Sequence, residues 1–210
     1  MSAAEKLTTI AENQQKVYDA GHEAGYLAGA QSEYDRFWDE FQNKGARASY
    51  YWAFFGDRFT DETYNPKYDL VVSYGSAVDG KSMFQSSPIT DTKKAIFAWH
   101  SLDNAFYSAT AMKTIRRLDV RATTKPLTNT FYKCTALENL NMTGTLVASV
   151  DLSYSPLLTK DSITSVINTM SATETGQTAT FSQTAVNNAF TTEEWNALKA
   201  TKSNWTIALA

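Results

Sequence analysis

Two stretches of this sequence are near-copies of each other, and they constrain the fold more than any other feature. Residues 127–140 read Leu-Thr-Asn-Thr-Phe-Tyr-Lys-Cys-Thr-Ala-Leu-Glu-Asn-Leu, and residues 102–115 read Leu-Asp-Asn-Ala-Phe-Tyr-Ser-Ala-Thr-Ala-Met-Lys-Thr-Ile. Weaker copies precede them at 82–89 and follow them at 152–158. Periods of this length indicate a stacked array, because a single unit cannot bury its apolar face alone.

The apolar residues of these copies share one register. The first apolar position recurs at steps of 22, 25 and 21 residues, and a second follows it five or six residues later. We expect these side chains to form one continuous interior that all the copies share. The predicted core consists of Phe84, Ile89, Phe106, Met112, Ile115, Phe131, Cys134, Leu137, Leu140, Leu152 and Leu158.

The pattern Phe-x-x-Cys/Ser-x-x-Leu-x-x-Leu resembles the BspA-like branch of the leucine-rich repeats. The matching positions are Phe106, Met112 and Ile115 in one copy and Phe131, Cys134, Leu137 and Leu140 in the next. The resemblance covers about residues 80–158. It implies a solenoid used for adhesion at bacterial surfaces. Short versions with an N-terminal helix are similar to proteins of bacteriophages that infect gut bacteria.

Two departures from the family pattern predict an irregular, short array. Thr145 stands where the family has Asn or Cys to close the turn. The copy that contains Met112 and Ile115 carries one residue too many before Leu118, which predicts a bulge or a widened turn there. A long, regular horseshoe is therefore not expected.

Composition and charge exclude several classes of protein. The net charge of -3 leaves no basic surface that could displace counterions from nucleic acid. Cys134 is the only cysteine, so the chain has no intramolecular disulfide, and its place in the repeat predicts a buried spacer. No stretch approaches the ~20 apolar residues of a membrane span. The first residues lack a basic and apolar leader, so we expect no Sec signal peptide, as for a virion component released by lysis.

The first 45 residues predict a helical stalk. They contain no proline up to the glycine at position 45, and small or apolar residues recur by sevens, as in a coiled coil. A Gly-x-x-x-Gly-x-x-x-Gly face follows, which fits either close packing in an oligomer or a flexible hinge; we favour close packing. The residues assigned to self-association are Leu7, Ile10, Val17, Gly21, Ala24, Gly25 and Gly29.

Residues 46–80 are rich in aromatic side chains and predict a connecting region with an N-terminal cap for the array. The run at 50–56 fits packing between domains, although aromatic clusters also stack on sugars. Asp57, Asp61 and Glu62 could supply the two acids of a glycoside hydrolase, a minor alternative because acids in loops are usually solvated.

The rest of the chain predicts short strands alternating with helices. Strands are expected near 94–99, 115–120, 137–142, 146–152, 179–181 and 205–209, with helices at 159–170 and 193–200. Thr192 is expected to cap the second of these helices. The last helix and strand would close the exposed end of the array. The predicted fold is α+β, with a helical stalk (1–45), a connecting region (46–80) and a repeat domain (81–210).

Residue patterns for catalysis and cofactor binding are sparse. His22 and His100 do not form a metal-binding pair, and no nucleotide-binding loop or nucleophile elbow occurs. We therefore expect a non-enzymatic protein without cofactors.

The predicted role is a virion structural and host-attachment protein of the bacteriophage tail or head fibre type. Its expected partners are further copies of itself, other virion proteins, and a receptor or glycan on the host surface. The alternatives are a bacterial cell-surface adhesin or interaction module and, third, a carbohydrate-binding or carbohydrate-active protein.

Overall fold

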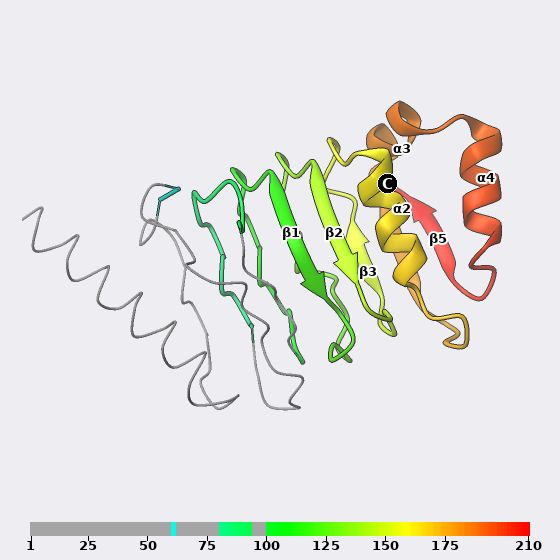
Figure 1. The fold of residues 1–210 in the computed structure, drawn as a ribbon, viewed down its shortest axis with the longest axis horizontal. Helices are drawn as coiled ribbons and strands as arrows, with labels where there is room; N and C mark the ends of the chain where they lie inside the picture. Colours follow the sequence, from blue (N-terminus) through cyan, green and yellow to red (C-terminus); the bar gives the residue numbers. More distant parts are fainter. Residues whose placement is uncertain (1–59, 62–79, 94–99) are drawn as a thin grey trace, which may run out of the picture. The chain divides into compact units, whose positions relative to one another are not determined.

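The computed structural model describes residues 60–61, 80–93 and 100–210 (Figure 1). The elements in chain order are β1 (Thr114–Asp119), β2 (Asn139–Thr143), β3 (Val150–Leu152), α2 (Lys160–Thr169), β4 (Thr178–Phe181), α3 (Gln183–Ala189), α4 (Thr192–Ala200) and β5 (Thr206–Leu209). The predicted stalk with its self-association residues, most of the connecting region and the strand expected at 94–99 lie outside the described residues.

All strand pairs among the described residues are parallel. β1 pairs with β2 in one sheet, and β3, β4 and β5 form a second sheet in that order. Isolated parallel bridges join Asp91 to Thr114 and Leu127 to Val150, so each sheet continues toward the preceding copy of the repeat. Parallel neighbours require a crossover segment between them, and the turns and helices of this chain supply it.

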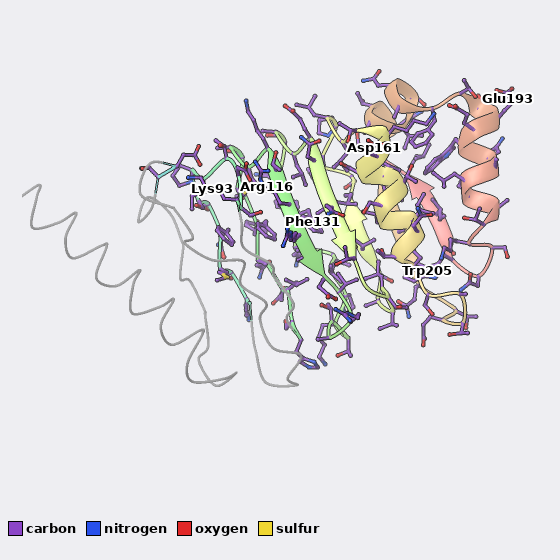
Figure 2. The ribbon with its side chains drawn as sticks, viewed as in Figure 1. Lys93, Arg116, Phe131, Asp161, Glu193 and Trp205 are labelled. Carbon is purple, nitrogen blue, oxygen red and sulfur yellow. The ribbon has the colours of Figure 1, made fainter. Side chains whose placement is uncertain are left out.

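The turns that precede the strands also stack. The backbone N–H of Phe84 donates to the carbonyl of Ala105 at 2.7 Å, and that of Phe106 donates to Thr130 at 3.0 Å. The ring of Phe84 lies parallel to that of Phe106, 5.2 Å between centroids, and Phe106 is 5.9 Å from Phe131. Figure 2 labels Phe131 among the strands. Residues spaced by one repeat therefore lie next to each other in space.

The interior of these turns is apolar and closed. Each of the eleven residues named above as the predicted core is at most 3% exposed. Burying one such side chain contributes about 1.5–3 kcal/mol, so the shared interior outweighs any single surface contact. Each close turn is completed two residues after its phenylalanine by a left-handed residue: Ser86, Ser108 and Lys133 have φ of 56°, 55° and 58°.

β1 carries the irregularity that its extra residue predicts. Its register with β2 shifts between Ile115 and Leu118. The N–H of Arg116 donates to the hydroxyl of Thr92 at 2.9 Å instead of joining a regular ladder. The guanidinium of Arg116 then reaches back to the carboxylate of Asp91, at 2.5 Å. Figure 2 labels Arg116 near Lys93, whose backbone N–H also donates to Asp91.

α2 covers the free edge of β2. Its residues Ser162 and Ser165 bond to the strand through their hydroxyls, and its apolar residues are buried. The Ser162 hydroxyl accepts from the N–H of Leu140 and donates to Glu138, both at 2.9 Å. The Ser165 hydroxyl accepts from the N–H of Met142 at 3.0 Å and donates to its carbonyl at 2.9 Å. Side chains thus replace a neighbouring strand, which protects the edge from pairing with other chains.

The C-terminal part differs from the prediction in two places. α3 was not expected, because its seven residues include a Thr and two Asn that weaken the helical pattern. The cap of α4 is Thr191 and not Thr192, because only Thr191 stands three residues before Glu194 and forms a capping box with it. Trp205, labelled in Figure 2, donates its indole N–H to the carbonyl of Ser171 at 2.9 Å, which holds the start of β5 against the end of α2.

Candidate binding surface

The stacked turns place alternate side chains inside and outside the array. In two successive turns the phenylalanine points inward, and the tyrosine that follows it is partly exposed. These tyrosines are Tyr107 and Tyr132. Because the turns stack one repeat apart, side chains at equivalent outward positions form a row along the surface.

Three tyrosines make up this row, which we call the tyrosine row: Tyr107, Tyr132 and Tyr154. The rings of Tyr107 and Tyr132 stack at 4.8 Å with 20° between their planes, and those of Tyr132 and Tyr154 lie 4.4 Å apart at 60°. The tilt has a sequence cause. Tyr154 comes two residues after Leu152, whereas Tyr132 comes one residue after Phe131, so the third tyrosine enters the row from a shifted position.

The C-terminal end of the row is the most exposed part. Tyr154 is 43% exposed and Leu157, in the same turn, is 52% exposed. They are two of the three large hydrophobic side chains that are exposed in the described part of the chain. The turn that carries Tyr154 therefore exposes two large apolar side chains at this end of the row.

The row combines apolar rings with polar groups. A hydrogen bond with Tyr132 raises the pKa of Tyr154, and the nearby Asp151 adds to this effect. The ammonium of Lys133 lies 5.5 Å from the ring centroid of Tyr132, within range of a cation–π contact. Tyrosines of this kind contribute apolar contact and a hydroxyl at the same site, as they do in many binding interfaces.

Cys134 is a spacer in the interior. Its side chain is fully buried, and its thiol donates to the carbonyl of Phe106 at 3.1 Å. Burial raises the pKa of the thiol to about 12. Since the thiolate is the nucleophilic form of cysteine, Cys134 is unsuited to covalent catalysis.

Of the three acids considered for glycoside hydrolysis, Asp57 and Glu62 lie outside the described residues. The third, Asp61, has a structural role: its carboxylate accepts the backbone N–H of Thr90 at 2.8 Å and the Thr90 hydroxyl at 2.5 Å. His100 is partly exposed. Within the described ranges no group of three or more His, Cys, Asp or Glu could hold a metal ion.

Comparisons with protein-family models, with curated proteins and with solved structures find no match to this chain. Within residues 60–61, 80–93 and 100–210, no helix has the length and apolar character needed to cross a membrane.

Sequence reasoning identified the phenylalanines of the repeat and passed over the tyrosines beside them. The signal was present, because Tyr follows Phe in both close copies of the repeat. A stacked array repeats its outer surface with the same period as its interior. A residue type that recurs just after a core position is therefore a candidate for the surface.

Proposed function

We propose that this chain is a non-enzymatic binding protein whose residues 81–210 form a short, irregular repeat array of the BspA-like leucine-rich type. In this proposal it is a bacteriophage virion protein of the tail or head fibre type, and the array attaches the particle to the host surface. Its partners are other copies of the chain, other virion proteins, and a host receptor or glycan.

The observation that carries the proposal is the tyrosine row. Three successive turns each contribute one ring, and each turn is anchored by a buried apolar residue. A surface built on a packed scaffold holds its side chains in place, so little conformational entropy is lost when a partner binds. Tyrosine is also among the residues most enriched at energetically important positions of interfaces.

The virion assignment rests on the sequence resemblance. The similar bacteriophage proteins combine an N-terminal helix with repeats of this kind. The chemistry of the described residues also fits a binding role better than catalysis. Asp61 is bound by Thr90, and the Cys134 thiol is buried with a raised pKa.

Binding to intact cells tests the role of the tyrosine row. The full-length chain, labelled with a fluorophore, is incubated with a panel of gut bacteria and measured by flow cytometry. We expect binding to at least one strain, and a loss of about tenfold or more in affinity when Tyr154→Ser is combined with Leu157→Ser, since losing a buried aromatic anchor costs 2 kcal/mol or more.

Lys125→Ser is the matched control, because Lys125 is exposed in the loop after β1 and lies outside the tyrosine row. Its binding should equal that of the wild type. Equal binding by the double variant and the wild type would contradict the proposal, as would binding to no strain of the panel. Immunogold labelling of purified phage particles separates the virion protein from a bacterial adhesin, which would instead be found on the producing cells.

A further inference from the structure

Among the described strands, β5 is the one whose outer backbone groups have no hydrogen-bond partner among the described residues. α2 closes the free edge of β2 with its serine hydroxyls, and the bridge from Leu127 to Val150 adjoins β3 on its outer side. β5 pairs with β4 on one side only. Figure 1 shows β5 (red) as the last strand of the chain.

The backbone groups that face this open edge can be assigned. Thr206 donates its N–H to the carbonyl of Gln177 at 2.9 Å, and Ala210 donates to Phe181 at 3.1 Å. Bonding alternates along a parallel strand, so Ala208 also faces β4. The N–H and C=O groups of Ile207 and Leu209 therefore point away from the sheet.

The rows of buried apolar side chains also end at β5. In the register of the sheet, Val150 and Ala179 precede Ile207 in one inward row, and Leu152 and Phe181 precede Leu209 in the next. The earlier members are at most 1% exposed, whereas Ile207 is half-buried and Leu209 is 39% exposed. Two inward rows thus end in side chains that are more exposed than the earlier members of each row.

We infer that β5 pairs with β5 of a second copy of this chain, in an antiparallel arrangement about a two-fold axis. If the axis passes through Ala208, Ile207 of each copy lies directly opposite Leu209 of the other. These are the two residues whose backbone groups point outward, so the pairing satisfies about four backbone hydrogen bonds. It also places Ile207 against Leu209 on the inward face and continues both apolar rows.

The chemistry of the strand favours a copy of itself as the occupant. β5 reads Thr-Ile-Ala-Leu, with no charge, no proline and no bulge, so its short length is the one feature it has that usually keeps an edge strand from pairing. In an isologous contact each charge would meet its own image or a near neighbour, and a strand without charge avoids that repulsion. The contact is short, so we expect a weak dimer with a dissociation constant in the micromolar range or above.

Site-specific crosslinking of the full-length chain tests this register. The two copies of Ala208 would form the central, non-hydrogen-bonded pair with Cα atoms about 4.5 Å apart. That distance lies in the range that a disulfide spans, about 4.4–6.8 Å. Ala208→Cys should therefore form a disulfide-linked dimer under mild oxidation at high micromolar concentration, while the buried Cys134 of the wild type should not.

Thr206→Cys is the matched control in the same strand. Its two copies would lie about 14 Å apart in this register, too far for a disulfide. Adding Leu209→Lys to Ala208→Cys should slow dimer formation about tenfold, because it places a charge in the apolar row. Urea unfolding verifies that each variant is folded. Equal crosslinking at positions 206 and 208, or none at 208, would overturn the inference. This result does not depend on what the tyrosine row binds or on whether the N-terminal segment self-associates.

Discussion

The thiol of Cys134 lies 3.1 Å from the carbonyl oxygen of Phe106, one repeat earlier in the chain. A small side chain at this position can thus reach back and bond the preceding turn. Ser155 stands three residues after Leu152, as Cys134 stands three residues after Phe131, and it is equally buried. Its hydroxyl is nevertheless the one buried side-chain oxygen or nitrogen in the described part of the chain that has no hydrogen-bond partner.

Removing this hydroxyl should stabilise the protein. A buried polar group without a partner costs about 1–3 kcal/mol, and alanine lacks the group. We expect Ser155→Ala to raise the free energy of unfolding, measured by urea denaturation, by about 1 kcal/mol after allowing for a small cavity. Cys134→Ala is the control at the equivalent position, and it should lower the free energy because it removes a satisfied contact. A loss of stability in Ser155→Ala equal to that of Cys134→Ala would contradict the assignment.

Two glycines with similar backbone conformation should respond differently to alanine. Gly144 has φ of 88° and Gly176 has φ of 75°. A Cβ at Gly144 would lie 2.5 Å from Cγ of Arg121 and 2.7 Å from Oδ1 of Asp119, whereas one at Gly176 meets nothing within 4 Å.

Gly176→Ala should cost only the left-handed backbone penalty of about 1 kcal/mol. Gly144→Ala should cost more, because the new methyl group also displaces the ion pair of Asp119 with Arg121. Thermal unfolding of the two variants measures the difference. Equal melting temperatures would show that the loop around Gly144 relaxes freely.

The serines of α2 should stabilise the protein through the edge of β2. Replacing Ser162 and Ser165 together by alanine leaves the N–H groups of Leu140 and Met142 without their hydroxyl acceptors. Each lost partner costs about 1–3 kcal/mol if the group stays buried. Alanine has a higher helix propensity than serine. A net loss in the free energy of unfolding would therefore come from the lost hydrogen bonds. Asn168→Ala, on the exposed face of α2, should be neutral or slightly stabilising in the same urea titration.

The ion pair of Asp91 with Arg116 predicts a specific pH dependence. Burial opposes ionisation of Asp91, but hydrogen bonds from Arg116 and from the backbone of Lys93 outweigh it and hold the pKa below its ordinary value of 3.8. A carboxylate with a lowered pKa contributes stability that is complete above the unfolded-state pKa and is lost as pH falls through the folded-state pKa.

Asp91→Asn should therefore lower the free energy of unfolding at pH 7 by about 1 kcal/mol or less, since the Arg116 side chain is 57% exposed and solvent screens the pair. The difference from wild type should shrink below about pH 4 and disappear at lower pH. Urea titrations from pH 7 to about pH 2 measure it. A difference that stays constant with pH would show that the carboxylate charge is not the cause.

Short-range patterns in the sequence located most of the described elements. The spacing from Phe106 to Phe131 indicated a shared interior, and the structure stacks these two rings. The extra residue after Ile115 indicated a bulge, and the register of β1 shifts there. Both features depend on side-chain size and residue count, which a sequence displays directly.

Features that depend on partners distant in the sequence were not predictable. Whether Ser162 is a helix-surface residue or a cap for β2 depends on a strand more than 20 residues earlier. The direction of Tyr132 depends on the turn conformation, which the left-handed Lys133 sets, and lysine is not a residue that marks such a turn. α3 is short and weakly patterned. Whether this segment forms a helix therefore depends more on its packing against the surroundings than on local propensity.

A double-mutant cycle between Phe106 and Phe131 tests most directly whether successive repeats share one interior. Each is changed to leucine alone and together, and the free energy of unfolding is measured by urea denaturation. Stacked rings should give a coupling energy of about 0.5–1.5 kcal/mol. The pair Phe106, which lies in a turn, and Phe181, which lies in β4, is the control and should be additive within about 0.5 kcal/mol. If the effects of the Phe106 and Phe131 substitutions also add within about 0.5 kcal/mol, the two repeats do not share one interior.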